Sequence, residues 1–154
     1  GNSRVQKFDS NFNFVFSFGG FGFGNGQFFN CSRLALDSAG FIFVTDFYNN
    51  RVQKFNNQGQ FVKTFGSYGH GDGQLYMPSG ILIDKNNRLI ILEAGNHRVS
   101  VYDNEGNFIK ALGEIGAGDY KFSLPSVISE GHNKTILITS PVLNKIQEFI
   151  TVRW

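Results

Sequence analysis

Cationic side chains recur at one position of a repeating pattern in this chain. Arg51 and Arg98 lie 47 residues apart, Lys145 follows at the same spacing, and Arg4 precedes them. Aromatic and imidazole side chains are interleaved with these cations: Phe21, Phe23, Phe47, Tyr48, Tyr68, His70 and His97. Cations attract phosphate groups and aromatic rings stack on unpaired bases, so this combination could bind single-stranded RNA. The alternative is a structural role, in which each repeated arginine bonds a neighbouring carbonyl or carboxylate.

The residue types needed for metal binding are scarce. The chain has 3 histidines, and His132 is expected on the face opposite to His70 and His97. Two histidines fall short of the ligand set of a zinc site, and no local spacing indicates that they meet the pair of a second chain. Cys31 has no evident histidine partner that would activate its thiol. The sequence therefore predicts no metal, no cofactor and no catalytic residue.

Carboxylates occupy two of the repeated positions. Asp37 and Asp84 end two predicted strands, where an aspartate commonly caps a turn. Asp46 and Glu93 stand before the sequences NNR and NHR. We expect these two to be salt-bridge or turn partners of the arginines that follow them, in preference to general bases.

The repeat behind these positions has a period of 47 residues. NSRVQKF (2–8), NNRVQKF (49–55) and NHRVSVY (96–102) are near-copies, and NKIQEF (144–149) is a weaker fourth. Other segments keep the same register, for example QFVKTFG (60–66) and NFIKALG (107–113). A fixed period in the forties is typical of repeat architectures such as propellers.

Each repeat contains four short apolar or alternating segments, which indicate strands. They are separated by turn-forming sequences such as DSAG, DKNN and DNEGN. No stretch shows a helical apolar period over three turns. Four strands per repeat predict an all-β fold, a β-propeller with 47-residue four-stranded blades and about three blades per chain. We name the strands a to d from the propeller axis outward.

The segment PSGILIDKNNRLIILEAGNHRVSVYDNEGNFIKALG (78–113) resembles an NHL repeat, and GNHRV (95–99) carries the defining feature of that family. The Gly-rich segment FGSYGHGDGQLYMP (65–78) is similar to the family's linker. The resemblance covers essentially the whole chain and weakens where SPVLNKIQEF (140–149) replaces the Asn-His-Arg element. It implies a six-bladed propeller that binds ligands on the face formed by the d–a and b–c connections. Some members bind RNA there, and lyases of the same repeat family hold a His-bound zinc at the centre.

The predicted blades do not close a ring. Residues 1–28 supply strands c and d of a split blade, 29–75 and 76–122 form two complete blades, and 123–154 supply strands a to c of the split blade. A homodimer would give six blades and cover both ends, since open propeller ends expose apolar surface. The alternative is that the chain is a piece of a longer propeller.

The predicted dimer contains one strand too many per split blade. Residues 4–8 and 145–149 are both strand c, and a closed blade has room for one. We expect strand 13–18 of one chain to pair with 145–149 of the other. Because the tail EFITVRW reads as a longer strand, Val5–Phe8 is expected to be displaced.

Composition narrows the classes of partner. The net charge is +2 and the sequence pI about 8.8, which permits an anionic partner without requiring one. A lone Cys31 cannot form an intramolecular disulfide, so a cytoplasmic location is favoured, and no segment is long and apolar enough to span a membrane. The sequence thus predicts a non-enzymatic interaction scaffold that binds a protein or single-stranded RNA through the loop face. The alternative is an NHL-like lyase or hydrolase with a metal in the central channel.

Overall fold

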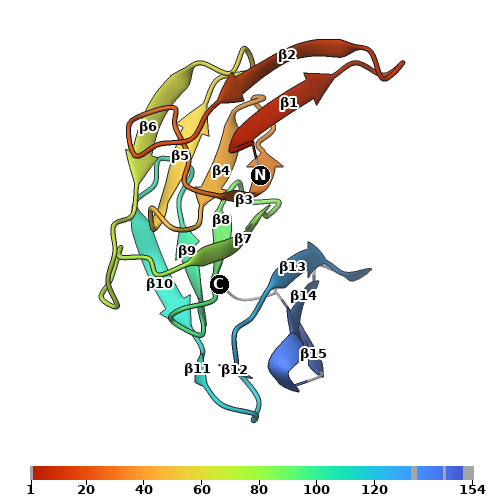
Figure 1. Ribbon diagram of the computed structural model, residues 1–154. Coiled ribbons are helices and arrows are strands. Elements are labelled where there is room, and N and C mark those ends of the chain that lie inside the picture. The colour runs from red at the N-terminus through yellow and green to blue at the C-terminus, as the bar shows by residue number, and fades with distance from the viewer. Residues whose placement is uncertain (1, 133–134, 144, 151–154) are drawn as a thin grey trace.

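The fold is built of β-sheets that follow one another in chain order along an arc. A computed structural model describes residues 2–132, 135–143 and 145–150. In Figure 1 the chain runs from the N-terminal strands at the top (red) to the last sheet at the lower right (blue). The prediction of an all-β chain with four-stranded repeats is confirmed.

Two antiparallel sheets of four strands form the complete blades. Blade 1 consists of β3 (Cys31–Leu36), β4 (Ile42–Asp46), β5 (Arg51–Phe55) and β6 (Phe61–Phe65), in this spatial order. Blade 2 repeats the order with β7 (Pro78–Ile83), β8 (Leu89–Glu93), β9 (Arg98–Tyr102) and β10 (Phe108–Leu112). The innermost strands β3 and β7 lie against each other, so strand a faces the axis.

Two partial sheets flank the complete blades. The N-terminal hairpin pairs β1 (Arg4–Phe8) with β2 (Phe14–Gly19). Blade 3 consists of β13 (Val127–Glu130), β14 (Thr135–Ser140) and β15 (Lys145–Ile150), with the 3-10 helix η2 (Pro141–Leu143) between the last two. A short parallel pair, β11 (Glu114–Ile115) and β12 (Lys121–Phe122), precedes blade 3. Both copies of strand c are therefore paired within this chain, β1 with β2 and β15 with β14.

Asx-type turns join the strands at the edge away from the loop face. Asp37 Oδ1 accepts hydrogen bonds from the backbone N–H groups two and four residues ahead, and Asp84 repeats this in blade 2. The predicted turn role of these two aspartates is thus confirmed. The c–d turns place a residue in the left-handed region, which is Gly59 (φ 76°) in blade 1 and Gly106 (φ 80°) in blade 2. In the N-terminal hairpin the same position holds Phe12 (φ 63°), whose side chain is exposed.

Three separate apolar cores lie between successive sheets. The core between blades 1 and 2 contains Phe43 and Val52 from one sheet and Leu89 and Ile91 from the other. The N-terminal hairpin packs Val5 and Phe18 against the opposite side of blade 1. Because side chains alternate along a strand, each complete blade contributes one face to each neighbouring core.

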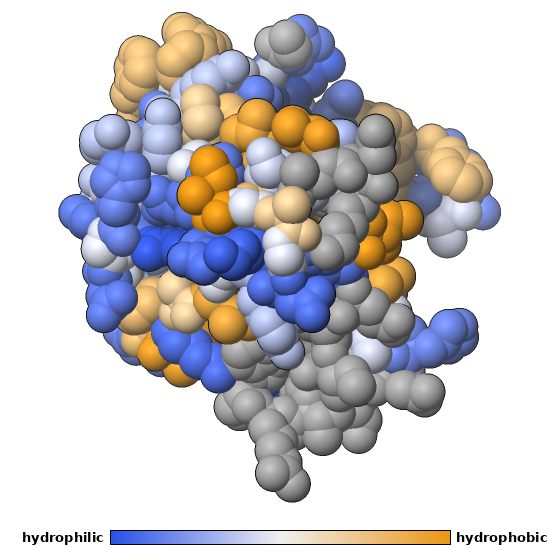
Figure 2. Space-filling model, turned by 90° about the horizontal axis from the view of Figure 1, so that it is seen from below, coloured by the Kyte–Doolittle hydropathy of each residue, from blue (hydrophilic) through white to orange (hydrophobic). Residues whose placement is uncertain are grey.

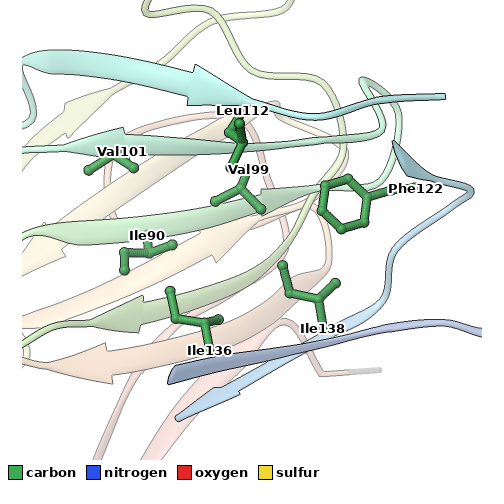
Figure 3. A pocket seen from close by; sticks show the side chains of 7 residues that line it. All are labelled: Ile90, Val99, Val101, Leu112, Phe122, Ile136 and Ile138. Atoms are coloured by element: carbon green, nitrogen blue, oxygen red, sulfur yellow. The ribbon is translucent and has the colours of Figure 1, made fainter. Parts of the chain in front are cut away.

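The core between blades 2 and 3 contains a small space that its side chains leave unfilled. Figure 3 shows Ile90, Val99 and Val101 of blade 2 facing Ile136 and Ile138 of β14. A cavity of about 20 Å³ remains among these side chains. Its lining is wholly apolar and also includes Leu112 and Phe122.

The single chain forms an open arc (Figure 1), and a ring of six blades would need further strands. Apolar residues, orange in Figure 2, reach the surface in several places between bands of polar residues. None of the helices in the described residues is long and apolar enough to cross a membrane.

Candidate functional site

The loop face is formed where two kinds of connection meet. In blade 1 the b–c loop at 47–50 lies on the d–a loop at 20–30, since Phe47 N–H donates to Asn30 O (3.0 Å) and Tyr48 N–H to Phe29 O (3.2 Å). Ala94 and the residue after it make the same two bonds to the d–a loop of blade 2. Both loops of a blade are therefore held in one fixed relation.

A buried carboxylate organises this face in blade 1. Asp46 is fully buried at the end of β4, and its Oδ1 accepts a hydrogen bond from the Phe29 N–H (2.7 Å). Its Oδ2 accepts from Arg51 Nε (2.9 Å), Asn49 Nδ2 (2.8 Å) and Gln53 Nε2 (3.3 Å). The carboxylate thus joins strand b, strand c and the preceding loop. We call this arrangement the latch.

Blade 2 repeats the latch with glutamate in place of aspartate. Glu93 Oε2 accepts from the Tyr76 N–H (3.0 Å) and from Asn96 Nδ2 (2.5 Å). Its Oε1 accepts from Arg98 Nε (2.8 Å) and from Ser100 Oγ. The prediction that Asp46 and Glu93 partner the following arginines is confirmed.

Both guanidinium groups also donate hydrogen bonds to carbonyl oxygens of the preceding loop. Arg51 Nη2 donates to Gly24 O (2.7 Å) and Gln27 O (2.9 Å). Arg98 reaches the loop of blade 2 in the same way, through three carbonyl oxygens at 2.8–3.0 Å. Arg51 and Arg98 therefore have the structural role that we considered as the alternative to RNA binding. The side chain of Lys145, predicted at the same repeat position, lies outside the described part of the chain.

Blade 3 has no carboxylate at the latch position. Ser140 stands where Asp46 and Glu93 stand, and its buried Oγ has no hydrogen-bond partner among the described residues. Gln147 Nε2 donates to Lys121 O (2.9 Å), and Gln147 Oε1 is buried without a partner in the same part of the structure. The loop of blade 3 is therefore held by a reduced latch.

Aromatic rings gather on the loop face of blade 1. Five residues from the d–a and b–c loops form the aromatic cluster: Phe21, Phe23, Phe29, Phe47 and Tyr48. Ring centroids are 5.4 Å apart for Phe21 and Phe29 and 4.9 Å apart for Phe29 and Tyr48. Phe21 and Phe23 are 65 % and 67 % exposed. This is an apolar surface that loops hold in place and solvent reaches.

The cluster diminishes from blade to blade. In blade 2 the positions of Phe21, Phe23 and Phe29 hold Tyr68, His70 and Tyr76, with centroids 5.2–6.1 Å apart. In blade 3 the corresponding residues are Ile115, Ala117 and Ser123. The structure thus brings Phe47 and Tyr48 together in one group and Tyr68 and His70 in another.

The histidines have separate environments. His70 Nδ1 is 2.6 Å from Asn96 Oδ1 on the exposed surface. His97 Nδ1 accepts a hydrogen bond from the Leu124 N–H (3.1 Å), as Asn50 Oδ1 does from the Met77 N–H (2.9 Å) in the blade before. In the described ranges, no three His, Cys, Asp or Glu side chains gather so as to hold a metal ion.

A hollow opens beside the aromatic cluster. Its volume is about 550 Å³, and Arg4, Phe21, Phe29, Cys31 and Tyr48 are among its lining residues. Burial raises the pKa of the Cys31 thiol, which disfavours the reactive thiolate. The hollow therefore offers aromatic surface and one exposed cation.

Four further site residues, at two positions of the repeat, were not predicted from the sequence. Phe29 and Tyr76 supply both a ring of each aromatic group and the N–H that the latch carboxylate accepts. Gln27 and Gln74 supply the loop carbonyls that the arginines bind. Each pair is 47 residues apart and conserves its chemistry, so the register could have pointed to them.

A family model described as 6-bladed beta-propeller (DUF5128) matches residues 28–114, which is more than half of the chain. The chain belongs to this 6-bladed propeller family. The match supports the prediction of a propeller. It does not identify the repeats as NHL repeats. No curated protein matches the sequence significantly.

Solved structures show the same fold at low sequence identity. A streptogramin B lyase is 17 % identical with a TM-score of 0.62, and the match covers 98 % of this chain and 49 % of that one. Virginiamycin B lyase from Staphylococcus aureus is 15 % identical with a TM-score of 0.61, covering 99 % and 50 %. A protein from Bacteroides caccae is 13 % identical with a TM-score of 0.64, covering 88 % and 47 %. The chain spans about half the length of these structures.

These comparisons correct one prediction. From the sequence we expected a protein that is not an enzyme, and that prediction is wrong because the matching structures include lyases. That prediction rested on the observation that the histidines and carboxylates of this chain do not gather at one place. Such a chain spans only half of the matching enzymes, so its own side chains are a poor guide to activity.

Proposed function

We propose that the loop face binds a peptide segment of a partner protein through the aromatic cluster of blade 1. The observation that supports this is the group of mutually contacting rings, of which Phe21 and Phe23 are about two-thirds exposed. Aromatic side chains contribute large contact areas and dominate the energy of many protein interfaces. The hollow beside the cluster would accommodate a side chain of the peptide.

The latch favours binding because it orders the loops before the ligand arrives. Asp46 and Arg51 fix the d–a loop of blade 1 through bonds to Phe29 N–H, Gly24 O and Gln27 O. A surface that is already ordered loses little conformational entropy on binding. The cluster would therefore act as a rigid platform.

RNA is supported less well on the same face. Stacking on the rings would still be available, but the guanidinium groups of Arg51 and Arg98 already bind loop carbonyls and carboxylates. A net charge of +2 adds little general attraction for phosphates. We therefore rank a peptide ligand before single-stranded RNA.

We further propose that the blades are of the NHL type. In support, the element GNHRV (95–99) supplies three connected functions in blade 2. Asn96 and Arg98 belong to the latch, and His97 bonds the loop that leads to the next blade. Because each of these residues makes a defined bond, we expect successive blades to retain the motif.

The test is a binding measurement with matched aromatic variants. Peptides selected from a random display library on the wild-type chain would be titrated by calorimetry against Phe21→Ser/Phe23→Ser. Loss of two hot-spot rings should weaken binding at least about tenfold. Phe12→Ala is the control, because Phe12 is an exposed ring on the opposite edge and outside the cluster.

A uridine oligonucleotide of about 10 nucleotides would be titrated in parallel at several salt concentrations. Tighter binding of this RNA, with an affinity that falls steeply with salt and is reduced in Arg51→Ala or Arg98→Ala, would reverse the ranking. Equal binding by wild type and Phe21→Ser/Phe23→Ser would remove the aromatic cluster from the site.

A lyase reaction on the loop face is the second candidate function. The observation that favours it is the fold shared with virginiamycin B lyase, of which one structure contains quinupristin. The chain would be incubated with quinupristin with and without added divalent metal, and the compound followed by liquid chromatography. A product whose rate of formation scales with protein concentration would support this candidate, and an unchanged compound would dismiss this substrate.

A further inference from the structure

The d–a loops of blades 1 and 2 each contain a dipeptide that can rearrange chemically. Asn25–Gly26 lies in the first loop, and Asp72–Gly73 has the same repeat position in the second. A glycine nitrogen can attack the Cγ of a preceding asparagine or aspartate, because glycine has no side chain that hinders the approach. Asn25 and Asp72 are both exposed to solvent. The two loops therefore have the residue types of a modification site.

The reaction closes a succinimide ring. The new bond joins the glycine nitrogen to Cγ, while the bond from Cγ to its leaving group breaks and the leaving group takes up a proton. Asparagine releases ammonia in this step, and aspartate releases water. Water then opens the ring at either carbonyl carbon and gives aspartate or isoaspartate. Because the glycine nitrogen is the nucleophile, a hydrogen bond that holds its N–H opposes the reaction.

The two loops have the same backbone structure around these dipeptides. Gly26 and Gly73 have φ values of 76° and 74°. In each loop the glutamine after this glycine accepts a side-chain hydrogen bond from the N–H two residues before the glycine, at 3.1 Å in blade 1 and 2.9 Å in blade 2. Arg51 and Arg98 bind the carbonyl oxygens of these same flanking residues. The loops can therefore be compared with a constant backbone.

The N–H of the reacting glycine has a different environment in each blade. In blade 1, Gly26 N–H donates to Gln53 Oε1 (2.8 Å), and Gln53 is fully buried. Ser100 has the position of Gln53 in blade 2, and its hydroxyl donates to Glu93 instead. Gly73 N–H has no hydrogen-bond acceptor among the residues that the structure describes. A fixed acceptor therefore holds the attacking nitrogen in blade 1 and not in blade 2.

We propose that Asp72–Gly73 is a site of isoaspartate formation and that Gln53 protects the equivalent Asn25–Gly26 from deamidation. If a hydrogen bond of ordinary net strength must break before the attack, the rate falls about fivefold. In the third d–a loop the same position holds Asp119–Tyr120, where the tyrosine side chain hinders the attack. The inference concerns the covalent chemistry of the loops and stands independently of the proposed ligand.

Isoaspartate formed from Asp72 would disturb the latch of blade 2. It lengthens the main chain by one methylene group between Gly71 and Gln74, whose carbonyl oxygens accept hydrogen bonds from Arg98 Nη2 at 3.0 and 2.9 Å. The same loop carries Tyr68. The modification would therefore loosen the loop that presents the aromatic rings of blade 2.

The test compares each dipeptide in the folded chain with the same dipeptide in an unstructured peptide. The wild-type chain and synthetic peptides of residues 22–28 and 69–75 would be aged in one neutral buffer. Liquid chromatography with electron-transfer fragmentation would then quantify deamidation and isoaspartate. Dividing the rate in the chain by the rate in the peptide corrects for the different intrinsic rates of asparagine and aspartate. This ratio should be at least about fivefold larger for Asp72 than for Asn25.

Two exchanges between the blades test the cause. Gln53→Ser removes the acceptor and should raise the deamidation rate of Asn25 about fivefold. Glu93→Asp/Ser100→Gln gives blade 2 the residues of blade 1 and should slow the isomerisation of Asp72. Equal ratios for the two dipeptides in the wild-type chain would overturn the proposal without any variant. An unchanged Asn25 rate in Gln53→Ser, with a circular dichroism spectrum like that of the wild type, would overturn the role of Gln53.

Discussion

Blades 2 and 3 differ most at the latch. In blade 2 the carboxylate of Glu93 accepts four hydrogen bonds that connect two strands and the d–a loop. In blade 3 the same position holds Ser140, and two buried polar atoms there have no partner among the described residues. The comparison teaches that the sheet itself does not depend on the carboxylate, since β14 and β15 still pair over their whole length. The hydrogen bonds of the latch instead connect the loops of the loop face to the strands.

The largest effect is expected from removing the carboxylate where the latch is complete. Asp46→Ala would leave the mostly buried guanidinium of Arg51 and the N–H of Phe29 without their acceptor. Breaking a buried ion pair by removing one partner costs about 3–5 kcal/mol of unfolding free energy. Urea denaturation of the wild type and the variant measures the difference.

The control for this prediction is Asp72→Ala, which removes an exposed aspartate from a loop of the same face. Surface substitutions of this kind change stability by less than about 0.5 kcal/mol. A loss in Asp46→Ala no larger than that of the control would contradict the role assigned to the latch.

The reverse experiment would build a latch in blade 3. Ser140→Asp combined with Lys145→Arg places a carboxylate beside an arginine and next to Gln147. Charge-assisted hydrogen bonds should outweigh the burial of the carboxylate and raise the unfolding free energy by about 1 kcal/mol. Ser140→Asp with Lys145→Ala lacks the cation and should be less stable than the wild type. If both double variants lose stability equally, the latch cannot be transferred between blades.

Tyr102 distinguishes blade 2 from blade 1 at a single atom. Its hydroxyl is buried without a partner in the described structure, and Phe55 fills the same position in blade 1. Because an unsatisfied buried hydroxyl is costly, Tyr102→Phe should raise the unfolding free energy by about 1 kcal/mol. Phe55→Tyr is the matched change in the opposite direction and should lower it. Thermal unfolding of both variants measures the pair.

The same residue predicts a pH dependence. Burial raises the pKa of Tyr102, with the nearby Glu93 carboxylate acting in the same direction. In the unfolded chain a tyrosine ionises near pH 10, so stability is independent of this group below about pH 10 and falls as the pH rises further. The stability gain of Tyr102→Phe should therefore grow between pH 9 and 11. A constant difference would show that Tyr102 ionises equally in both states.

The smallest effect concerns the turn of the N-terminal hairpin. Phe12 has φ 63° at a position where blades 1 and 2 have glycine. Phe12→Gly relieves the left-handed strain but gives the unfolded chain more freedom, so a net gain of about 0.5 kcal/mol is expected. Phe12→Ala keeps the strain and should show no gain. Equal thermal midpoints for the two variants would contradict this account.

The 47-residue register predicted the sheets well because it is a property of the sequence itself. Strands, turns and the pairing of Asp46 with Arg51 follow from equivalent positions in successive repeats. The parallel pair of β11 and β12 was not foreseen, because it arises where the d–a loop folds back on itself. Nothing in the local sequence of these two-residue strands distinguishes them from loop.

The grouping of side chains on the loop face was harder to predict than the fold. Phe47, Tyr48, Tyr68 and His70 were correctly expected among the loops, but their grouping depends on which loops touch. For the arginines the position was easy to predict, because they recur with the repeat. The full set of groups that they bind became clear only from the structure. The pairing of Arg98 with Glu93 was expected, but the fold also shows three loop carbonyls bound to the same guanidinium.

Separate cores between successive sheets have a consequence for local opening of the chain. Each sheet contacts only its neighbours, so stability is distributed along the arc as a sum of nearest-neighbour terms. Blade 2 has a core on either side, whereas blade 3 has one core on a single side and that core contains the cavity. Amide protons of β8 and β9 should therefore exchange most slowly, and those of β14 should be released in smaller, more frequent openings. Closing the ring would remove this gradient, because a ring has no last blade.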